Sequence, residues 1–500
     1  RYVIQESNQA LVGQHFVGGH VAYKLNSSKS YLKNNLSVNA SFPKNEGLVN
    51  DFVSQTLSGH SFLLSNVMKA NYKKKNGGVA DLEWKASFAD KRGVLNVSET
   101  KMSQLLRQRN FQSEATGSLL AFTIPHLMFN LNGKVMFDWQ RVSAGLNSLS
   151  DASGSEQKTW LLGAFVSPKI LLHFGNRLQW LVYVPVGVKY YHSADGSLDY
   201  DKRFFSTCPY SNLTYKPTGR LSFDLTTICE ESMPSVLSQM VLKHYVNYRT
   251  TMSNPYQVEI APNRSVKQAF TSSYKDIIKM LFGGVTLSYV DVRNGNSMGY
   301  QVVDDVVNYI VQPQSTKNRV WQIEQMVSKG FFRWNSKISE SLSIGTSRSE
   351  YYVGGDCHDG RSDYLQAKIS YVASVRKWLN LSISNDYSVS KPYTDGKASG
   401  EVYRTFMNAS SFTFWLGKQL NVVPSVQYYH NNYFSSGRNN VFLNTVMEYY
   451  WGNATLSLKC TNLLDSRTFH RIIDNGITRY SGEYQLRGRT ILFGIRIKII

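Results

Sequence analysis

Apolar and polar residues alternate along most of this chain, over runs that are longer than the strands of ordinary soluble sheets. In the stretch LSVNASF, the apolar side chains that share one face are Leu36, Val38, Ala40 and Phe42. The runs extend over about 10–15 residues, whereas soluble strands mostly have five or six and a tilted strand needs about 9–11 to cross a bilayer. The pattern predicts an all-β chain that folds as a large antiparallel transmembrane β-barrel.

The composition agrees with a wall in which only every second residue faces lipid. Charged residues make up 18% of the chain, below the roughly 25% typical of soluble domains. The most apolar segment, 277–290, is interrupted by Lys279, Gly283 and Gly284, so no helical membrane span is predicted. The net charge of +20 is scattered along the chain. This scatter argues against nucleic acid as a partner and favours either a basic lumen or loops that contact anionic lipid head groups, with outer-membrane lipid and lipopolysaccharide as the expected partners.

Short and long connections alternate, as in outer-membrane barrels with short periplasmic turns and long extracellular loops. Short turns are predicted at 132–133, 175–176, 216–219, 376–377, 417–418 and 452–453. Longer polar loops are predicted at 146–157, 192–202, 353–362, 392–402, 432–440 and 465–486. Two segments without alternation are also predicted to be long outside loops: 231–265, with a short helix over 236–248, and 293–317.

The alternation of connections gives the last strand a direction. The turn at 452–453 is short and therefore periplasmic, so 487–500 descends and the C-terminus is periplasmic. We expect this strand to pair with the first one, because an unpaired edge in lipid is costly. Counting back gives roughly 21 strands, the first near 11–24 and descending. Such an odd number cannot close, so a barrel of about 22 strands is expected, with a strand upstream of Arg1 or formed partly by residues 1–7.

Few residues suggest chemistry. Cys208 and Cys229 lie on the two strands that flank the turn at 216–219, so a disulfide is predicted if their registers match; the alternative is two unpaired thiols. Cys357, His358 and Asp359 lie in the predicted loop 353–362, where a solvated loop tip is favoured over a metal site because further ligands are absent at zinc spacing. No catalytic, metal or cofactor-binding motif is found, so neither an enzyme nor a cofactor is predicted.

Tyrosine and tryptophan side chains gather near the predicted strand ends, for example at Tyr190, Tyr191 and Trp451. Amphipathic rings suit the head-group layer of a bilayer, so an interface girdle is the favoured interpretation. The alternative is that some of these rings stack on a ligand such as a sugar.

The C-terminal third resembles the barrel of TonB-dependent outer-membrane transporters. The tetrapeptide Asn462-Leu463-Leu464-Asp465 is similar to the N-L-[FL]-[ND] that ends their penultimate strand. The final strand, with Gly488-Arg489-Thr490, is similar to their closing [PG]-R-x strand, and 29–42 is also similar. The rhythm matches over nearly all 500 residues. The chain departs from the family in ending on Ile500 rather than Phe, and in showing neither a plug domain nor a TonB-binding segment.

The resemblance implies TonB-dependent uptake of a scarce nutrient (a glycan, a peptide or a metal chelate) across the outer membrane. Residues 1–500 would then be the barrel, and the plug and the contact with TonB would belong to a missing N-terminal region. Two alternatives remain open. One is a structural barrel subunit that holds a surface lipoprotein or other outer-membrane subunits without transport. The other is a passive pore, although an unplugged barrel of this size would leak.

Overall fold

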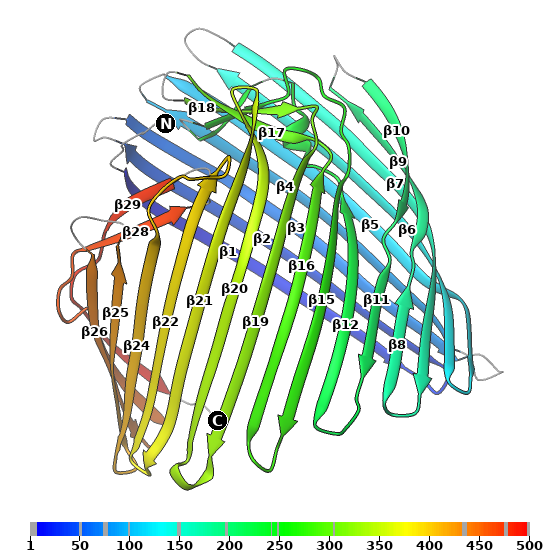
Figure 1. Cartoon of the computed structure of the whole chain (residues 1–500). Coiled ribbons are helices and arrows are strands. Elements are labelled where there is room, and N and C mark those ends of the chain that lie inside the picture. Colours follow the sequence, from blue (N-terminus) through cyan, green and yellow to red (C-terminus); the bar gives the residue numbers. More distant parts are fainter. Residues whose placement is uncertain are drawn as a thin grey trace.

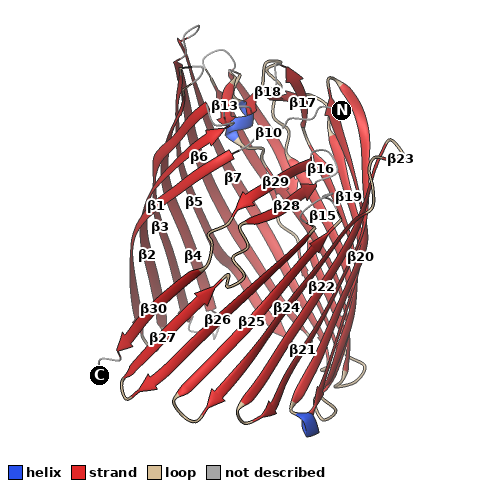
Figure 2. Ribbon diagram, turned by 90° about the vertical axis from the view of Figure 1, so that its left-hand side faces the viewer, coloured by secondary structure: helices blue, strands red, loops and turns tan. Residues whose placement is uncertain are grey.

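The chain forms one continuous sheet that is rolled into a wall (Figures 1 and 2). This computed structural model describes residues 8–49, 53–73, 79–98, 101–147, 152–195, 199–241, 243–247, 250–303, 306–432, 438–474 and 479–497. Neighbouring wall strands follow one another in sequence and pair antiparallel, which confirms the predicted all-β fold class. No helix within these ranges is long and apolar enough to cross a membrane.

The wall strands run from one edge of the sheet to the other in sequence order. In the first half they are β1 (Asn8–Asn26), β2 (Ser30–Val49), β3 (Val53–Lys73), β4 (Val79–Val97), β5 (Met102–Ile124), β6 (Leu127–Asn147), β7 (Ala152–Phe174), β8 (Leu178–Tyr183), β9 (Val186–Ala194), β10 (Asp199–Thr207), β11 (Tyr210–Tyr215) and β12 (Leu221–Ser232). In the second half they are β15 (Asn263–Asp276), β16 (Leu281–Asn294), β19 (Thr316–Phe331), β20 (Ser336–Val353), β21 (Asp356–Arg376), β22 (Leu379–Thr394), β24 (Tyr403–Leu416), β25 (Leu420–Asn431), β26 (Asn439–Trp451), β27 (Ala454–Thr461) and β30 (Thr490–Ile497).

Smaller elements do not belong to these wall strands. They are η1 (Val236–Gln239), β13 (His244–Asn247), β14 (Thr250–Ser253), β17 (Ser297–Val303), β18 (Val306–Gln312), η2 (Phe332–Trp334), β23 (Lys397–Ala398), β28 (Thr468–Asp474) and β29 (Arg479–Gln485).

Two strands of the wall are interrupted at prolines. β8 and β9 lie end to end beside β7, and Pro185 separates them. In the next strand, β10 pairs with β9 and β11 pairs with β8, and Pro209 separates β10 from β11. Proline has no N–H to donate, so the ladder breaks at these points. If β8 and β9 are counted as one wall strand, and β10 and β11 as another, the described wall has 21 strands. This number agrees with the strand count made from the sequence.

One end of the wall carries short turns and the other carries the longer connections; we call them the short-turn end and the long-loop end. The turns predicted at 175–176, 216–219, 417–418 and 452–453 are confirmed, and the one predicted at 376–377 lies one residue further on. The turn predicted at Asn132-Gly133 is wrong, because these residues lie inside β6. The chain turns instead at Pro125-His126, where His126 has φ +70°. Asn-Gly favours a tight turn locally, but here both residues are paired with β7.

Several predicted loops are strands. The predicted loop 353–362 is wrong: β20 and β21 are joined by Gly354-Gly355 alone, with φ +59° and +101°, and Cys357, His358 and Asp359 lie in β21. Successive positive φ values give the tight turns that suit hairpins. In the same way, β22 turns at Asp395-Gly396 (φ +50° and +77°) within the predicted loop 392–402. The predicted loop 293–317 forms the hairpin β17–β18.

The remaining predicted loops are also partly strand. The predicted loop 146–157 includes the end of β6 at Asn147 and the start of β7 at Ala152, and 192–202 includes the end of β9 at Ala194 and the start of β10 at Asp199. Within 432–440, β26 begins at Asn439. The residues at 148–151, 196–198 and 433–437 lie outside the described ranges. The predicted loop 465–486 holds the hairpin β28–β29. The strands of the first half, from β1 to β7, reach 19 to 23 residues and are longer than predicted.

The first and last wall strands do not meet in the described residues. β1 pairs with β2 and β30 pairs with β27, and no register joins β1 to β30, so the expected closing pair is not formed. Both strands run from the long-loop end toward the short-turn end, and two strands of the same direction cannot form an antiparallel pair. Residues 1–7 and 498–500, which the sequence argument also used, lie outside the described residues.

The two faces of the wall differ in chemistry. On β6, Val135 is 54% exposed and lies opposite Ala115 and Ala164, so apolar side chains form a continuous outer surface. On the other face, Asp138 accepts hydrogen bonds from Gln112 and Gln140 at 3.2 and 3.1 Å. Large exposed apolar surfaces are rare on soluble proteins. A wall that is apolar outside and polar inside is the arrangement of a transmembrane barrel.

Candidate functional site

A loop between β12 and β15 folds inward at the long-loop end. The 3₁₀ helix η1 begins after Ser235, whose side chain accepts a hydrogen bond from the N–H of Leu237. Its residue Val236, together with Met240 just after it, packs on Val142 of β6, and Met240 and Val142 are fully buried. Val142 lies on the polar, inner face, so the loop sits inside the wall (Figure 2). The helix predicted over 236–248 is therefore shorter than expected, and β13 occupies its C-terminal part.

Side-chain amides fasten this loop to the wall. Gln104 on β5 donates from Nε2 to the carbonyl of Tyr245 and accepts its N–H at Oε1, both at 2.7 Å, so it acts as a neighbouring strand would. Gln239 accepts hydrogen bonds from Tyr191 and from Ser193, the latter at 3.2 Å. Buried polar groups are costly unless they are paired. These pairs therefore hold the loop in one position.

The loops of the long-loop end form one layer. β14 pairs in parallel with β18, and β18 pairs antiparallel with β17. β17 in turn makes two parallel pairs with β20, including Gly299 opposite Tyr352. The hydroxyl of Thr251 donates to Asn308 at 2.6 Å and reinforces the join. The predicted loops 231–265 and 293–317 are thus a single folded unit at the mouth of the barrel.

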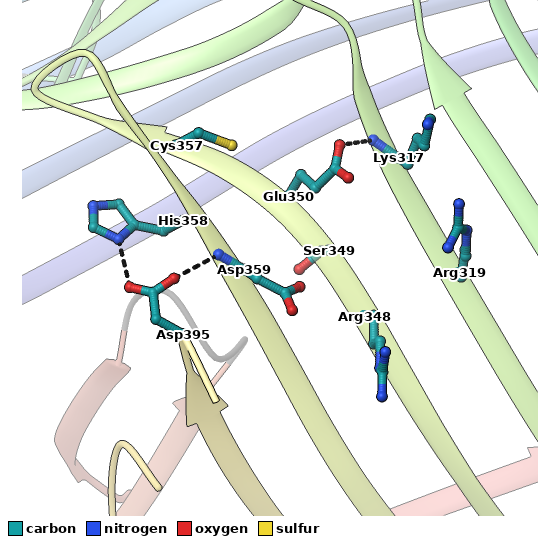
Figure 3. A pocket seen from close by; sticks show the side chains of 9 residues that line it. All are labelled: Lys317, Arg319, Arg348, Ser349, Glu350, Cys357, His358, Asp359 and Asp395. Atoms are coloured by element: carbon teal, nitrogen blue, oxygen red, sulfur yellow. Dashed lines mark hydrogen bonds and ion pairs between the residues drawn. The ribbon is translucent and has the colours of Figure 1, made fainter. Parts of the chain in front are cut away.

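A cavity of about 400 Å³ lies where β19 to β22 reach the long-loop end (Figure 3). Its lining residues are Lys317, Arg319, Arg348, Ser349, Glu350, Cys357, His358, Asp359 and Asp395. Arg319 shares a face of β19 with Trp321 and Ile323, which are 58% and 49% exposed. This part of the cavity therefore opens to the outside of the wall and not to the lumen.

Hydrogen bonds fix the carboxylates of this cavity. Asp395 accepts from Nδ1 of His358 at 2.8 Å and from the N–H of Asp359 at 2.9 Å. The His358 ring and then the Asp359 N–H hold the pKa of Asp395 below its usual range. Glu350 accepts from the backbone N–H of Lys317 at 2.9 Å. Charged side chains of both signs suit the recognition of ions. No cluster of three or more His, Cys, Asp or Glu side chains in the described part of the chain could hold a metal.

The motif behind the family resemblance fastens the last wall strand. Asn462 donates from Nδ2 to the carbonyls of Ser466 and Arg487, at 2.8 and 3.1 Å. The backbone N–H of Arg489 donates to Asp465 at 2.9 Å, and its Nε donates to the carbonyl of Leu463 at 3.1 Å. Leu464, the remaining motif residue, is exposed. The motif joins the ends of β27 and β30 where the chain leaves and re-enters the wall.

The predicted aromatic girdle divides between the two faces. Tyr190 packs against Trp160 of β7 on the outer face, with ring centres 5.0 Å apart and the ring planes tilted by 35°. Tyr191, the next residue, is 3% exposed and lies behind the inward loop. A girdle position therefore suits Tyr190 and not Tyr191.

Cys208 and Cys229 lie close together as free thiols. The two thiols are within hydrogen-bonding reach of each other. The backbone N–H of Cys229 donates to the carbonyl of Pro209 at 3.1 Å, so Cys229 lies opposite Pro209 in the strand pairing and diagonal to Cys208. Arg264 donates from Nε to the sulfur of Cys229 at 3.5 Å. The disulfide remains a prediction.

Mild oxidation of the folded protein with diamide is expected to join Cys208 to Cys229, because contact between the two thiols removes most of the cost of bringing them together. The measurement is the number of free thiols per unfolded monomer after oxidation, which should fall from four to two. The variant Cys208→Ser is the control and should keep three. Four thiols in the oxidised wild-type monomer would refute the bridge.

Comparisons with known proteins extend the fold assignment. No family model matches the sequence, and no curated protein matches it. Among solved structures, the copper transporter OprC superposes with a TM-score of 0.54 at 10% identity, covering 98% of this chain and 79% of that one. The alcaligin outer-membrane receptor FauA from Bordetella pertussis gives 0.51 at 13%, covering 88% and 68%. The ferripyoverdine receptor of the outer membrane of Pseudomonas aeruginosa gives 0.50 at 8%, covering 98% and 71%.

At these identities the similarity establishes the fold alone. The chain has the fold of the large barrels of outer-membrane receptors, as the C-terminal motifs predicted. The structural relatives are transport receptors rather than enzymes.

Proposed function

We propose that this chain is the barrel of an outer-membrane transporter that imports a nutrient (a glycan, a peptide or a metal chelate) with energy supplied through TonB. The observation that carries the proposal is a lipid-compatible wall with a polar interior whose mouth holds a folded loop layer anchored by Gln104, Gln239 and Met240. In this proposal the long-loop end is extracellular and the C-terminus is periplasmic.

The inner face supports passage of polar molecules. Glu83 pairs with Lys69 and Lys85 at 3.0 and 3.4 Å, and Glu114 pairs with Lys134 at 2.7 Å. Charged groups that are already paired with each other keep a lumen hydrated without leaving uncompensated charge. A ligand arriving from outside first meets the loop layer and then this polar surface. The proposal assigns the plug and the TonB contact to sequence upstream of residue 1.

The test uses a strain that carries the natural gene. A strain without the gene should fail to grow when one nutrient class (glycans, peptides or metal chelates) is supplied as the limiting source. A strain without TonB should show the same defect, and complementation should restore growth. Normal growth on every class would contradict transport and favour a structural subunit, and a growth defect that does not depend on TonB would favour a passive pore.

A further inference from the structure

Cations face one another on the outer surface of β4 to β7. Arg92 lies directly opposite Arg107, Arg109 lies opposite Arg141, and Arg141 lies opposite Lys158. We call Arg92, Arg107, Arg109, Arg141 and Lys158 the basic patch. Like charges that face each other across strands destabilise a sheet. Three such pairs of facing cations are unfavourable unless anions lie close to them.

The carboxylates nearby only partly neutralise the patch. Asp90 makes two hydrogen bonds with Arg107 and lies 3.4 Å from Arg109. Glu156 lies 2.6 Å from Arg141 and 2.8 Å from Lys158. Each carboxylate is thus shared by two cations, and Arg92 is exposed and makes no ion pair within the described residues. Side chains of the patch remain accessible, from 33% exposed at Arg109 to 56% at Lys158.

The patch lies on the lipid-facing surface, directly above a row of aromatic rings. Two residues closer to the short-turn end, Phe111 lies opposite Trp139, and Trp139 lies opposite Trp160. Below them, Val135 and Phe137 belong to the apolar outer surface. Tryptophan rings of a membrane protein settle at the head-group level. The basic patch therefore stands at the depth of the head groups, on the side of the long-loop end.

We propose that the basic patch binds the phosphate groups of a phosphorylated glycolipid of the outer leaflet, the chemistry of lipopolysaccharide, while the apolar surface below contacts its acyl chains. Arginine pairs bidentately with phosphate, and several arginines around one site give strong charge-assisted bonds. Continuity with the apolar surface favours a lipid over a soluble anion. The inference rests on the outer-membrane location in the proposed function.

A second group of cations provides a comparison within the same wall. Arg348 lies directly opposite Arg319 and Arg361. Arg319 stands two residues above a tryptophan, Trp321, as the cations of the basic patch stand above their aromatic rings. Here, however, Glu350 and Asp359 line the same cavity (Figure 3). With Asp395, three carboxylates line this cavity and match its three cations, Lys317, Arg319 and Arg348. The basic patch has two carboxylates, Asp90 and Glu156, for five cations. Because its excess of positive charge favours phosphate, we assign the glycolipid site to β4–β7.

The experiment measures binding of purified lipopolysaccharide to the folded, detergent-solubilised protein. The double variant Arg109→Gln/Arg141→Gln removes two outer charges. The matched control, Lys85→Gln/Lys134→Gln, removes two charges from the inner face of neighbouring strands. Each lost arginine should weaken binding roughly tenfold, and the control should bind like the wild type. Arg92→Gln, which breaks no ion pair in the described residues, is the second variant in case the double variant folds poorly.

Two further probes identify the source of the anion. Dephosphorylated lipopolysaccharide should bind weakly to every variant, and millimolar inorganic phosphate should compete poorly. Equal binding of wild type and both patch variants, or equal binding of the dephosphorylated lipid, would overturn the proposal. Full competition by inorganic phosphate would also overturn it, since the site would then take a soluble anion. Lipopolysaccharide binding is measured on the folded barrel and does not require transport. The binding result therefore tests the glycolipid site, the growth result tests TonB-dependent uptake, and either proposal can be contradicted without the other.

Discussion

Purified protein carrying Met240→Asp is expected to pass several times more ion current in planar bilayers than the wild-type chain. Met240 is fully buried against Val142 on the inner face of the wall. A carboxylate at that position would have no partner, and burying an unpaired charge costs more than the loop contacts can supply. The loop should therefore leave the wall. A barrel with more strands than the porins then has a wide aqueous path.

The control is Tyr256→Asp, which introduces the same charge at a residue of the same loop that is 63% exposed. It should conduct like the wild type. Tryptic cleavage after Lys243, three residues beyond Met240, reports release of the loop independently of current and should be faster in Met240→Asp. Faster cleavage without a rise in conductance would show that the loop layer does not limit passage through the mouth.

The two faces of the wall were predictable because side-chain direction in a strand depends on local sequence alone. The apolar set that begins at Leu36 lies on one face of β2, as its spacing of two residues requires. The turn at Gly452-Asn453 was also accessible, because Gly452 adopts φ +55° there. In both cases the information lies within a few consecutive residues.

The predicted loops were less successful for a physical reason. Above the lipid, a strand is wet on both faces, so it loses its apolar alternation without losing its hydrogen bonds. Cys357, His358 and Asp359 read as a polar loop for this reason, although they pair with β20 residue by residue. The turn predicted at Asn132-Gly133 was wrong for the opposite reason. The local sequence favours a turn, but both residues pair with β5 on one side and β7 on the other.

The basic patch could not be found in the sequence, because the register that brings Arg109, Arg141 and Lys158 together joins three separate strands. A weaker local signal does exist. Each of these cations stands two residues from an aromatic ring, in the order cation–x–aromatic on descending strands and aromatic–x–cation on the ascending β6. Arg319 and Trp321 repeat the pattern on β19. The order reverses with strand direction because the head-group layer stays at one height.

Val135→Arg is expected to destabilise the folded barrel by about 2–4 kcal/mol, the cost of placing arginine on the lipid face near the middle of a bilayer. Val135 lies midway along the apolar outer run of β6, opposite Ala115 and Ala164, and neither neighbour can pair with a guanidinium. The measurement is denaturant-induced unfolding of protein reconstituted in lipid vesicles, with the heat-modifiable band on gels as a check of folding.

Met136→Arg is the matched control, because it makes the same kind of substitution one residue further along the same strand but on the inner face. There Glu114 and Asp138 already bind polar partners, so an arginine can stay hydrated and find a carboxylate. Its effect should be well under half of that at position 135. Equal losses at both positions would mean that lipid does not touch this face of β6, and the membrane-spanning wall on which the transport and glycolipid proposals depend would have to be abandoned.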